Sequence, residues 1–272
     1  MNSPFSLACL CCLGSLAHGA SSLVIDFESQ SADDLFTGDV TGWTQDNPNL
    51  SAFGQTFPLA FISTSDYGSG SSNVGVLGTQ FANTADNSAT TVSGDIDSSG
   101  LRDLPANVTL NLAILDDNTD QFTGRDDFSV SLVGSASQSL ATIQFTQDSG
   151  SSSFWNIAVG VNGAAPTAVS GAFVTAQSGY IFSMNFGPSS TDFRYGPSGG
   201  GSSPVLISSE AAVAGFGTGL AGIEMTHTPV ATAGTSLNTL VFDNITVSVP
   251  EPSSLTLFGI AVSVLAARRR RS

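Results

Sequence analysis

An acidic stretch in the middle of the chain has the residue types of a calcium-binding loop. Residues 116–127 read DDNTDQFTGRDD, so side-chain oxygens stand at positions 1, 3, 5 and 12. Calcium takes about six to eight oxygen ligands, and carboxylates and amides at this spacing can surround one ion. Position 6, where a sharp turn favours glycine, holds Gln121, and strand-like segments flank the loop. We therefore expect a loop between strands that is either a solvated acidic hairpin or a calcium site formed by Asp116, Asn118, Asp120 and Asp127.

Two further acids stand in the apolar segment Leu23–Glu28, near the N-terminal end. Side chains alternate between the two faces of a strand, so Asp26 and Glu28 should lie on one face and the apolar side chains on the other. Two carboxylates on one face could act as an acid/base pair in sugar hydrolysis or as metal ligands. They could equally be solvent-facing acids on an edge strand.

Asp243 stands near the other end, in the apolar segment Leu240–Val249. Strict alternation would place it in one row with Val241, Ile245 and Val247. A carboxylate on such a face must be paired, hydrogen-bonded or metal-bound, unless a bulge turns it outward. Asp26, Glu28 and Asp243 are therefore a second candidate group of calcium ligands.

Two glycine-rich segments match functional patterns by letter only. Residues 217–222 read GTGLAG, but a proline and threonines follow where a phosphate-binding helix would have to begin. Residues 196–200 read GPSGG, but glycines follow where a nucleophile elbow needs a helix. His227 is the only histidine after residue 20, and the three cysteines are Cys9, Cys11 and Cys12. The segment after residue 20 is therefore expected to have no disulfide, no cysteine-based site and no credible catalytic triad.

The elements that must position these residues are short strands. Between residues 21 and 249, short alternating apolar segments recur between turn-forming clusters, and no segment has helical apolar spacing. Asn162-Gly163 predicts a hairpin turn with positive φ, and Pro197–Pro204 predicts a long surface loop. The expected strands are Leu23–Glu28, Leu59–Ser63, Val74–Leu77, Val108–Leu115, Phe128–Val133, Leu140–Thr146, Phe154–Val161, Ala172–Ala176, Tyr180–Phe186, Gly222–Thr226 and Leu240–Val249. About a dozen strands favour one all-β domain, a single antiparallel two-sheet sandwich of the jelly-roll or concanavalin-like kind.

Charge restricts the partners of this domain. The chain has no lysine, and Arg102, Arg125 and Arg194 are the only arginines between residues 21 and 250. Of the chain's 22 acidic residues, all but Glu251 lie in this segment, and with these three arginines its net charge is near −18. A nucleic acid needs a basic face, so nucleic-acid binding is excluded. Dense negative charge favours solubility in salt or a divalent cation as partner.

Loose resemblances connect the domain with carbohydrate. Laminarinase-like hydrolases on concanavalin-type sandwiches carry Glu-x-Asp-x-x-Glu on a strand, but here Val24 and Ser29 stand where the two outer glutamates should be. Carbohydrate-binding jelly rolls resemble this chain in their short acidic first strand and in a last strand like residues 240–247, and their two ends can share a structural calcium ion. We expect a non-catalytic module that binds exopolysaccharide, and the alternative is a polysaccharide hydrolase or lyase on the same fold. An exposed groove lined by Trp43, Trp155 and tyrosines would favour carbohydrate in either case.

The N-terminus predicts export. Residues 1–20 have an apolar run from Phe5 to Ala17 and small residues at its end, as a secretory signal peptide does, although no Lys or Arg precedes the run. We therefore divide the chain into a signal peptide (1–20), a β-sandwich ectodomain (21–249) and a C-terminal tail (250–272).

The tail has three parts. Pro250-Glu251-Pro252 is followed by an uncharged apolar run from Leu255 to Ala267 and by four arginines, Arg268, Arg269, Arg270 and Arg271. A helix of thirteen residues spans roughly 20 Å, which suits a short transmembrane helix whose arginines extend to the interface and stay on the cytoplasmic side.

This tail resembles the PEP-CTERM sorting signal of exported proteins of Gram-negative bacteria. The resemblance implies that exosortase, a membrane peptidase, recognises Pro250, Glu251 and Pro252 and cuts near them. It also implies a precursor anchored in the inner membrane through the C-terminal helix, and a mature protein at the cell surface or in the extracellular matrix.

Overall fold

Alternation of polar and apolar residues forms this chain into strands. The structure is a computed structural model that describes residues 21–46, 49–52, 55–58, 60–65, 72–78, 89–96, 107–116, 126–148, 154–199, 203–213, 219–229 and 238–249. These residues form seventeen strands and no α-helix. In β9 (Asp127–Gly134), every second side chain is buried, with Phe128, Val130 and Leu132 pointing inward. Burial of this period is expected of a sheet that packs one face on a core.

Eight strands form the larger sheet. Their order is β15-β14-β13-β8-β17-β6-β5, and β1 also pairs with β17. Every pairing is antiparallel. The bounds are β1 (Ser21–Ile25), β5 (Ala60–Ser65), β6 (Ser72–Gly78), β8 (Asn107–Asp116), β13 (Gly179–Phe186), β14 (Ser190–Pro197), β15 (Val205–Ala211) and β17 (Asn238–Val249).

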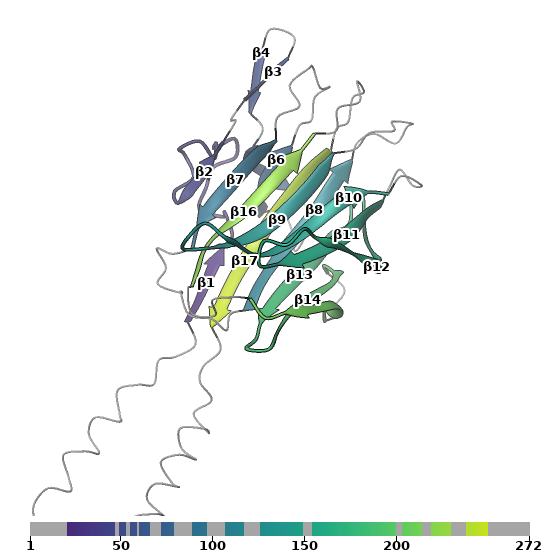
Figure 1. Ribbon diagram of the computed structural model, residues 1–272. Helices are drawn as coiled ribbons and strands as arrows, with labels where there is room; N and C mark the ends of the chain where they lie inside the picture. The colour runs from purple at the N-terminus through teal and green to yellow at the C-terminus, as the bar shows by residue number, and fades with distance from the viewer. Residues whose placement is uncertain are drawn as a thin grey trace, which may run out of the picture.

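Seven strands form the second sheet, in the order β12-β11-β10-β9-β16-β7-β2. Its pairings are also antiparallel. Besides β9, its strands are β2 (Trp43–Gln45), β7 (Thr90–Asp95), β10 (Ser139–Gln147), β11 (Phe154–Val161), β12 (Thr167–Thr175) and β16 (Leu220–Thr228). A small hairpin, β3 (Asn49–Ala52) with β4 (Gln55–Pro58), extends from one end of the molecule (Figure 1).

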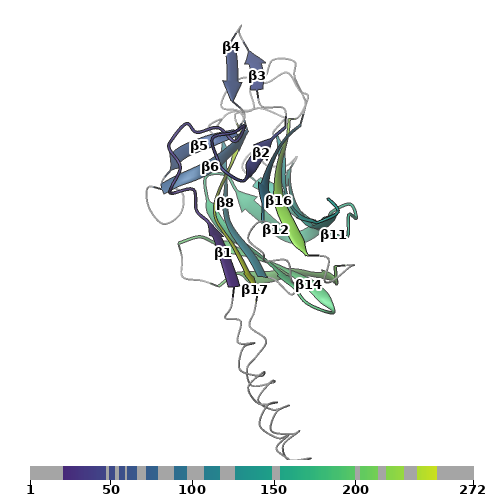
Figure 2. The ribbon, with the colours of Figure 1, turned by 90° about the vertical axis from the view of Figure 1, so that its left-hand side faces the viewer.

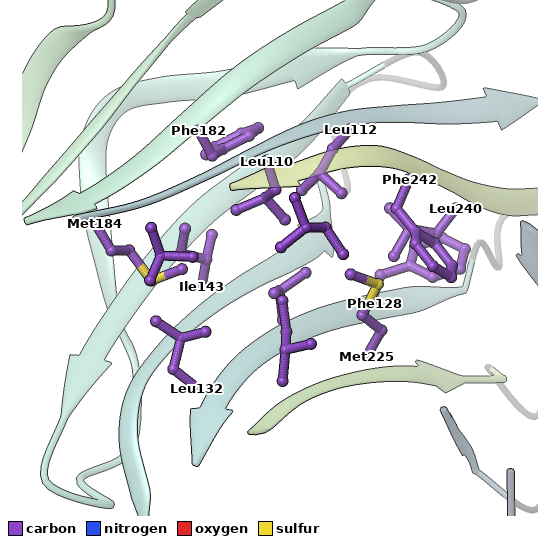
Figure 3. Close-up of a cluster of buried hydrophobic side chains, with 14 of the residues drawn as sticks. Leu110, Leu112, Phe128, Leu132, Ile143, Phe182, Met184, Met225, Leu240 and Phe242 are labelled. Carbon is purple, nitrogen blue, oxygen red and sulfur yellow. The ribbon is translucent and has the colours of Figure 1, made fainter. Parts of the chain in front are cut away.

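The two larger sheets enclose one hydrophobic core. Figure 2 shows them from the side, with β5 and β6 on one side and β16 on the other. Leu110 and Phe182 from the eight-stranded sheet meet Leu132, Ile143 and Met225 from the seven-stranded sheet (Figure 3). All five side chains are buried. The fold is therefore an all-β, antiparallel two-sheet sandwich, as the sequence predicts.

Four aromatic rings extend the core beside β1 and β2. Phe27, Phe36, Trp43 and Phe242 are buried, and each ring centroid lies 5.3–5.9 Å from the other three. Most of these contacts are edge-on or tilted, the arrangement that aromatic quadrupoles favour. The rings attach the irregular segment between β1 and β2 to the last strand of the chain.

Two glycines make room for this aromatic group. A Cβ atom on Gly75 would overlap the ring of Phe242, and one on Gly94 would lie 2.7 Å from the Trp43 indole. A larger residue at either position would displace a ring or the strand beneath it.

The predicted turn at Asn162-Gly163 is confirmed. Asn162 has a φ of 58° and Gly163 a φ of 70°, the conformation of a type I′ turn. The backbone N–H of Ala164 donates to the carbonyl of Val161 at 3.0 Å and closes the turn between β11 and β12. The predicted Pro197–Pro204 loop joins β14 to β15, and residues 200–202 within it lie outside the described residues.

The last strand contains a bulge that strict alternation did not predict. Asn244 has a φ of 49°, and the register with β8 shifts between Asp243 and Thr246. Phe242 and Ile245 therefore both face the core, while Asp243 lies on the opposite face beside Val241. The prediction that Asp243 shares one row with Ile245 and Val247 is therefore wrong. The bulge puts Ile245 and Val247 on the core side and leaves Asp243 on the other.

The first and last strands of the sandwich lie side by side. β1 pairs with β17 so that Ser21 is opposite Val249, and both strands lead to the end of the sandwich opposite β3 and β4 (Figure 1). The predicted signal peptide and C-terminal helix lie outside the described residues. Among the residues that are described, no helix has the length and apolar character needed to cross a membrane.

Candidate functional site

The outward surface of the seven-stranded sheet carries a continuous group of polar side chains. We call it the polar face. On β7, β16, β9 and β10 it consists of Thr91, Ser93, Glu224, Thr226, Ser129, Ser131, Thr142, Gln144 and Thr146, all partly exposed. The register aligns them in cross-strand rows, for example Ser93, Glu224, Ser131 and Thr142. Neighbours in such a row are close enough to contact one ligand together.

Hydroxyl groups within the polar face are hydrogen-bonded to one another. The oxygens of Thr91 and Thr226 lie 3.1 Å apart. Thr142 Oγ1 lies 2.9 Å from Ser131 Oγ and 3.0 Å from Ser139 Oγ. A hydroxyl can donate one hydrogen bond and accept two, so these groups keep capacity for a polar ligand.

An aromatic pair borders the polar face. Phe154 on β11 and Phe173 on β12 meet edge to face, with ring centroids 4.9 Å apart. Phe173 is 43 % exposed. It is opposite Asn156, which is exposed and in turn opposite Thr146. A surface phenylalanine beside amide and hydroxyl groups provides an apolar contact next to hydrogen-bonding groups.

The described charged side chains on and beside this face are acidic. Glu224 lies within the face, Asp127 begins β9, and Asp95 ends β7. Burial raises the pKa of Asp127 above its ordinary value of 3.8, and the nearby Asp126 adds to the rise. The backbone N–H of Gln147, 3.3 Å from Asp127 Oδ1, opposes the rise in pKa by stabilising the charged form.

A buried polar cluster lies at the edge of the core, at one end of β16. His227 Nε2 and Asp126 Oδ2 are 2.7 Å apart, and both side chains are almost fully buried. The Asp126 backbone connects further residues, because its carbonyl accepts from Trp155 Nε1 at 3.0 Å and its N–H donates to Asn238 Oδ1 at 3.1 Å. Asn238 begins β17, so the cluster joins the two sheets. Its burial from solvent makes it a structural connection rather than a site for a polymer substrate.

The sequence suggested His227 only as a possible triad member, and its pairing with Asp126 was not predicted. A signal was available, since alternation places His227 in the inward row with Ile223 and Met225. A histidine on an apolar face needs a polar partner. The partner is 101 positions away in the chain, and local patterns cannot identify it.

Trp43 and Trp155 do not together line an exposed groove, the arrangement that would favour carbohydrate, although Trp43 contributes to a hollow beside β1 and β2. Trp43 and Trp155 are both buried, one in the aromatic group of the core and the other above Asp126. Tyr180 and Tyr195 stack on each other at 5.9 Å and pack partly buried against the core. The described aromatic contact surface is instead the Phe154–Phe173 pair.

The structure separates the predicted end-strand acids. β1 ends at Ile25, and Phe27, with a φ of 54°, turns inward while Asp26 and Glu28 remain exposed. Asp26 Oδ1 accepts from the backbone N–H of Glu28 at 3.3 Å, which is a local turn contact.

Asp26 and Asp243 line two different hollows. Asp26 and Asp95 line one of about 350 Å³ between β1 and β2. Asp243 is buried beside Asn111 in another, only about 10 Å³ in volume, and Asn244 Nδ2 donates to its Oδ2 at 2.6 Å. Among the described residues, no group of three or more Asp, Glu, His or Cys side chains is placed to hold a metal ion.

The predicted calcium loop lies largely outside the described residues. Asn118 and Asp120 fall in the segment 117–125, and the side chain of Asp116 is likewise not described. Asp127 is described and lies on the seven-stranded sheet. Calcium binding at this loop stays a prediction.

The glycine-rich segments behave as their flanking residues indicated. Strand β16 begins at Leu220, so no helix follows the glycines of residues 217–222. Ser198 and Gly199, which has a φ of 86°, follow the end of strand β14 at a turn. Neither segment has the geometry of a phosphate loop or a nucleophile elbow.

Comparison with known proteins identifies the tail. Residues 248–271 match the family model of the PEP-CTERM protein-sorting motif. The motif implies export, processing by exosortase and sorting to the cell surface. The predicted motif residues Pro250, Glu251, Pro252 and Arg268–Arg271 are in the matched segment and outside the described residues. No curated protein matches the chain.

Solved structures resemble the sandwich. The catalytic domain of a GH131 β-glucanase from Podospora anserina aligns with a TM-score of 0.51 and 12 % identity, covering 83 % of this chain and 94 % of that one. The CBM2 module of the evolved Dit of Lactobacillus casei BL23 phage J-1 aligns with a TM-score of 0.47 and 13 % identity, covering 84 % and 96 %. The Emp47p carbohydrate recognition domain aligns with a TM-score of 0.47 and 9 % identity, covering 86 % of this chain and 98 % of that one. At these identities the likeness is one of fold alone, an antiparallel two-sheet β-sandwich.

Proposed function

We propose that the ectodomain is a non-catalytic surface or matrix module that binds exopolysaccharide through the polar face. One observation carries the proposal: partly exposed hydroxyl and amide side chains cover four adjacent strands, and the exposed Phe173 stands at their border. The sorting motif of the tail implies export to the cell surface, where a module of this kind would contact secreted polysaccharide.

The chemistry of the polar face suits a sugar chain. Serine and threonine hydroxyls and the Gln144 and Asn156 amides both donate and accept hydrogen bonds, as sugar hydroxyls do. The aromatic pair can pack against the apolar C–H groups of a sugar ring. A sheet holds its side chains in fixed rows. Binding therefore costs little entropy for ordering the protein side chains.

Anchoring through the tail is compatible with such binding. The chain ends of the ectodomain leave together at one end of the sandwich, where Ser21 pairs with Val249. The polar face lies on strands β7, β16, β9 and β10 of the other sheet. Attachment at the chain ends therefore leaves this face available.

Hydrolysis is the second candidate, and one observation favours it. Glu224 is opposite Ser93, and Asp95 lies two residues further along the same strand face. Diagonal neighbours of this kind have Cα atoms about 7–8 Å apart, and glycosidases use carboxyl pairs about 5–9.5 Å apart. The other outward side chains of the central strands β9 and β10 include Ser129, Ser131 and Gln144, which provide hydrogen bonds rather than acid/base groups.

Binding and turnover measurements distinguish the two functions. The full chain, purified in mild detergent, is tested against a panel of polysaccharides for retardation in affinity electrophoresis and for release of reducing ends. We expect retardation without turnover. Phe173→Ala should weaken retardation about twofold to tenfold, the effect of an aromatic contact of about 0.5–1.5 kcal/mol.

Leu206→Ala is the matched control, because Leu206 is also exposed but lies on the edge strand of the other sheet. Equal loss in both variants would contradict the proposed face. Turnover that Glu224→Gln and Asp95→Asn abolish would establish the hydrolase instead.

A further inference from the structure

The described charged side chains around the polar face all carry negative charge. Glu224 is partly exposed within it, with Ser93 and Ser131 as its cross-strand neighbours. Asp95 is opposite Gly222, two residues before Glu224, and Asp127 is opposite Thr228, four residues after it. At about 3.3 Å per residue, these two carboxylates belong to positions about 7 and 13 Å from Glu224 along β16.

Compensating positive charge is missing from the described part of this sheet. The chain has no lysine, and Arg194 is the only arginine among the described residues. Arg194 lies on β14 of the other sheet, between Ser183 and Leu206. His227 is buried beneath the sheet against Asp126. Among the described residues, therefore, no positively charged side chain stands beside Glu224 where a polymer would lie across the central strands.

We propose that Glu224 makes the polar face selective for polysaccharides without carboxylate, sulfate or phosphate groups. This inference rests on the proposed function and specifies the class of ligand for that site. A neutral sugar chain can accept hydrogen bonds from Ser93 and Ser131 and donate to the Glu224 carboxylate. An acidic sugar unit at the same place brings a second negative charge next to the first.

The electrostatic magnitude is sufficient for selection. Two like charges about 4 Å apart repel by about 1 kcal/mol even in bulk water, and several times more near a protein surface. The lower figure alone corresponds to about a fivefold difference in affinity. Salt screens such repulsion over about 10 Å at 0.1 M, so the selection should weaken as ionic strength rises.

The test compares each neutral polymer with a negatively charged derivative of the same polymer. The full chain is titrated with neutral glucan, galactan and mannan and with the carboxymethylated derivative of each, at low and at high salt. We expect at least about fivefold tighter binding of the neutral form of any polymer that binds at low salt, and a smaller ratio at high salt. Glu224→Gln should reduce the ratio at low salt, chiefly because affinity for the carboxymethylated polymer rises once the repelling charge is removed.

Glu210→Gln is the matched control. It removes the same charge from β15 of the other sheet, where Glu210 Oε1 accepts from Ser208 Oγ at 2.5 Å. Equal binding of neutral and acidic polymers by the unaltered protein would overturn the inference and leave the proposed function standing. An equal change of the ratio in Glu210→Gln would also overturn it, because overall charge and not Glu224 would then be responsible. Binding of no polymer in either form would contradict the proposed function itself.

Discussion

The two outer faces of the sandwich differ in how far solvent reaches them. On the eight-stranded sheet, Val74, Val76, Ala113 and Val241 point away from the main core yet are at most 4 % exposed. They form a second apolar cluster with Phe61 and Leu115 partly buried against it. On the seven-stranded sheet, the outward side chains of β9 and β16 are partly exposed and polar at most positions.

This difference separates stability from binding. Apolar residues on a covered face contribute by burial, about 25 cal/mol for each Å² removed from water. Hydroxyl, amide and carboxylate groups on an accessible face contribute little to stability but can contact a ligand. A substitution on the first face should therefore change folding, and one on the second should change recognition.

The largest expected effect comes from placing one carboxylate on each face. Val241→Glu puts it in the buried cluster and should lower the free energy of unfolding by several kcal/mol, because a buried charge without a partner is costly. Gln144→Glu puts it on the polar face and should change stability by no more than about 0.5 kcal/mol. Urea unfolding followed by tryptophan fluorescence measures both. Similar losses in the two variants would show that the faces do not differ in this way.

Calcium should give the next largest effect, if the predicted loop binds it. Binding to the folded state alone would raise stability by about 2.7 kcal/mol at a hundredfold excess over Kd. The melting temperature of the full chain is compared in calcium and in chelator at low salt, and we propose that it rises with calcium.

Two variants distinguish the two predicted calcium sites, the loop before β9 and the end-strand group. Asp127→Asn should blunt the rise if the loop before β9 holds the ion, and Asp243→Asn should blunt it if the end-strand group does. Identical melting in calcium and in chelator would remove both sites.

The buried pair beneath the polar face should have a smaller effect. His227→Ala removes the partner 2.7 Å from Asp126 Oδ2 and should destabilise the fold by about 1–3 kcal/mol, the cost of leaving a buried polar group unsatisfied. Thr228→Ala changes the next residue, which is exposed, and should be nearly neutral. If thermal unfolding shows both variants equally stable, the cluster does not join the sheets as described.

The smallest effect concerns pH. Burial raises the pKa of Asp127, so the folded state binds its proton more tightly than the unfolded state. Its charged form costs stability above the folded pKa, and this cost disappears as pH falls below the unfolded value of about 3.8. Asp127→Asn should therefore be slightly more stable than the unaltered chain at pH 7, with the difference closing toward pH 3. A difference that grows on acidification would have the wrong sign.

Much of the fold could be predicted because alternation is a local signal. The segment Phe154–Val161 was predicted with the bounds that β11 has, and β9 extends its prediction by one residue at each end. Strands β2, β3, β4, β7, β14 and β15 were not predicted. Two of them give weak signals: β7 reads TTVSGD, with Val92 its only large apolar side chain, and β14 contains Gly196 and Pro197. In those segments tertiary pairing, not composition, determines the strand.

The candidate site could be predicted only in fragments. Ser129 and Ser131 alternate visibly with buried residues of β9, so an outward polar row was available from the sequence. That β16 lies beside β9, which brings Glu224 opposite Ser131, depends on a pairing across about ninety positions of the chain and no local pattern encodes it. The bulge at Asn244 is likewise not predicted by alternation, since one left-handed residue puts Asp243 and Ile245 on opposite faces of the strand.

Hydroxyl-radical footprinting of the full chain, with and without a bound polysaccharide, tests the central claim most directly. Phe154 and Phe173 border the polar face, whereas Val205 and Leu206 are exposed on the edge strand of the other sheet. We predict that the ligand lowers oxidation of both phenylalanines and leaves Val205 and Leu206 unchanged. Protection of Val205 and Leu206 with unchanged oxidation of Phe154 and Phe173 would contradict the assignment of binding to the seven-stranded sheet.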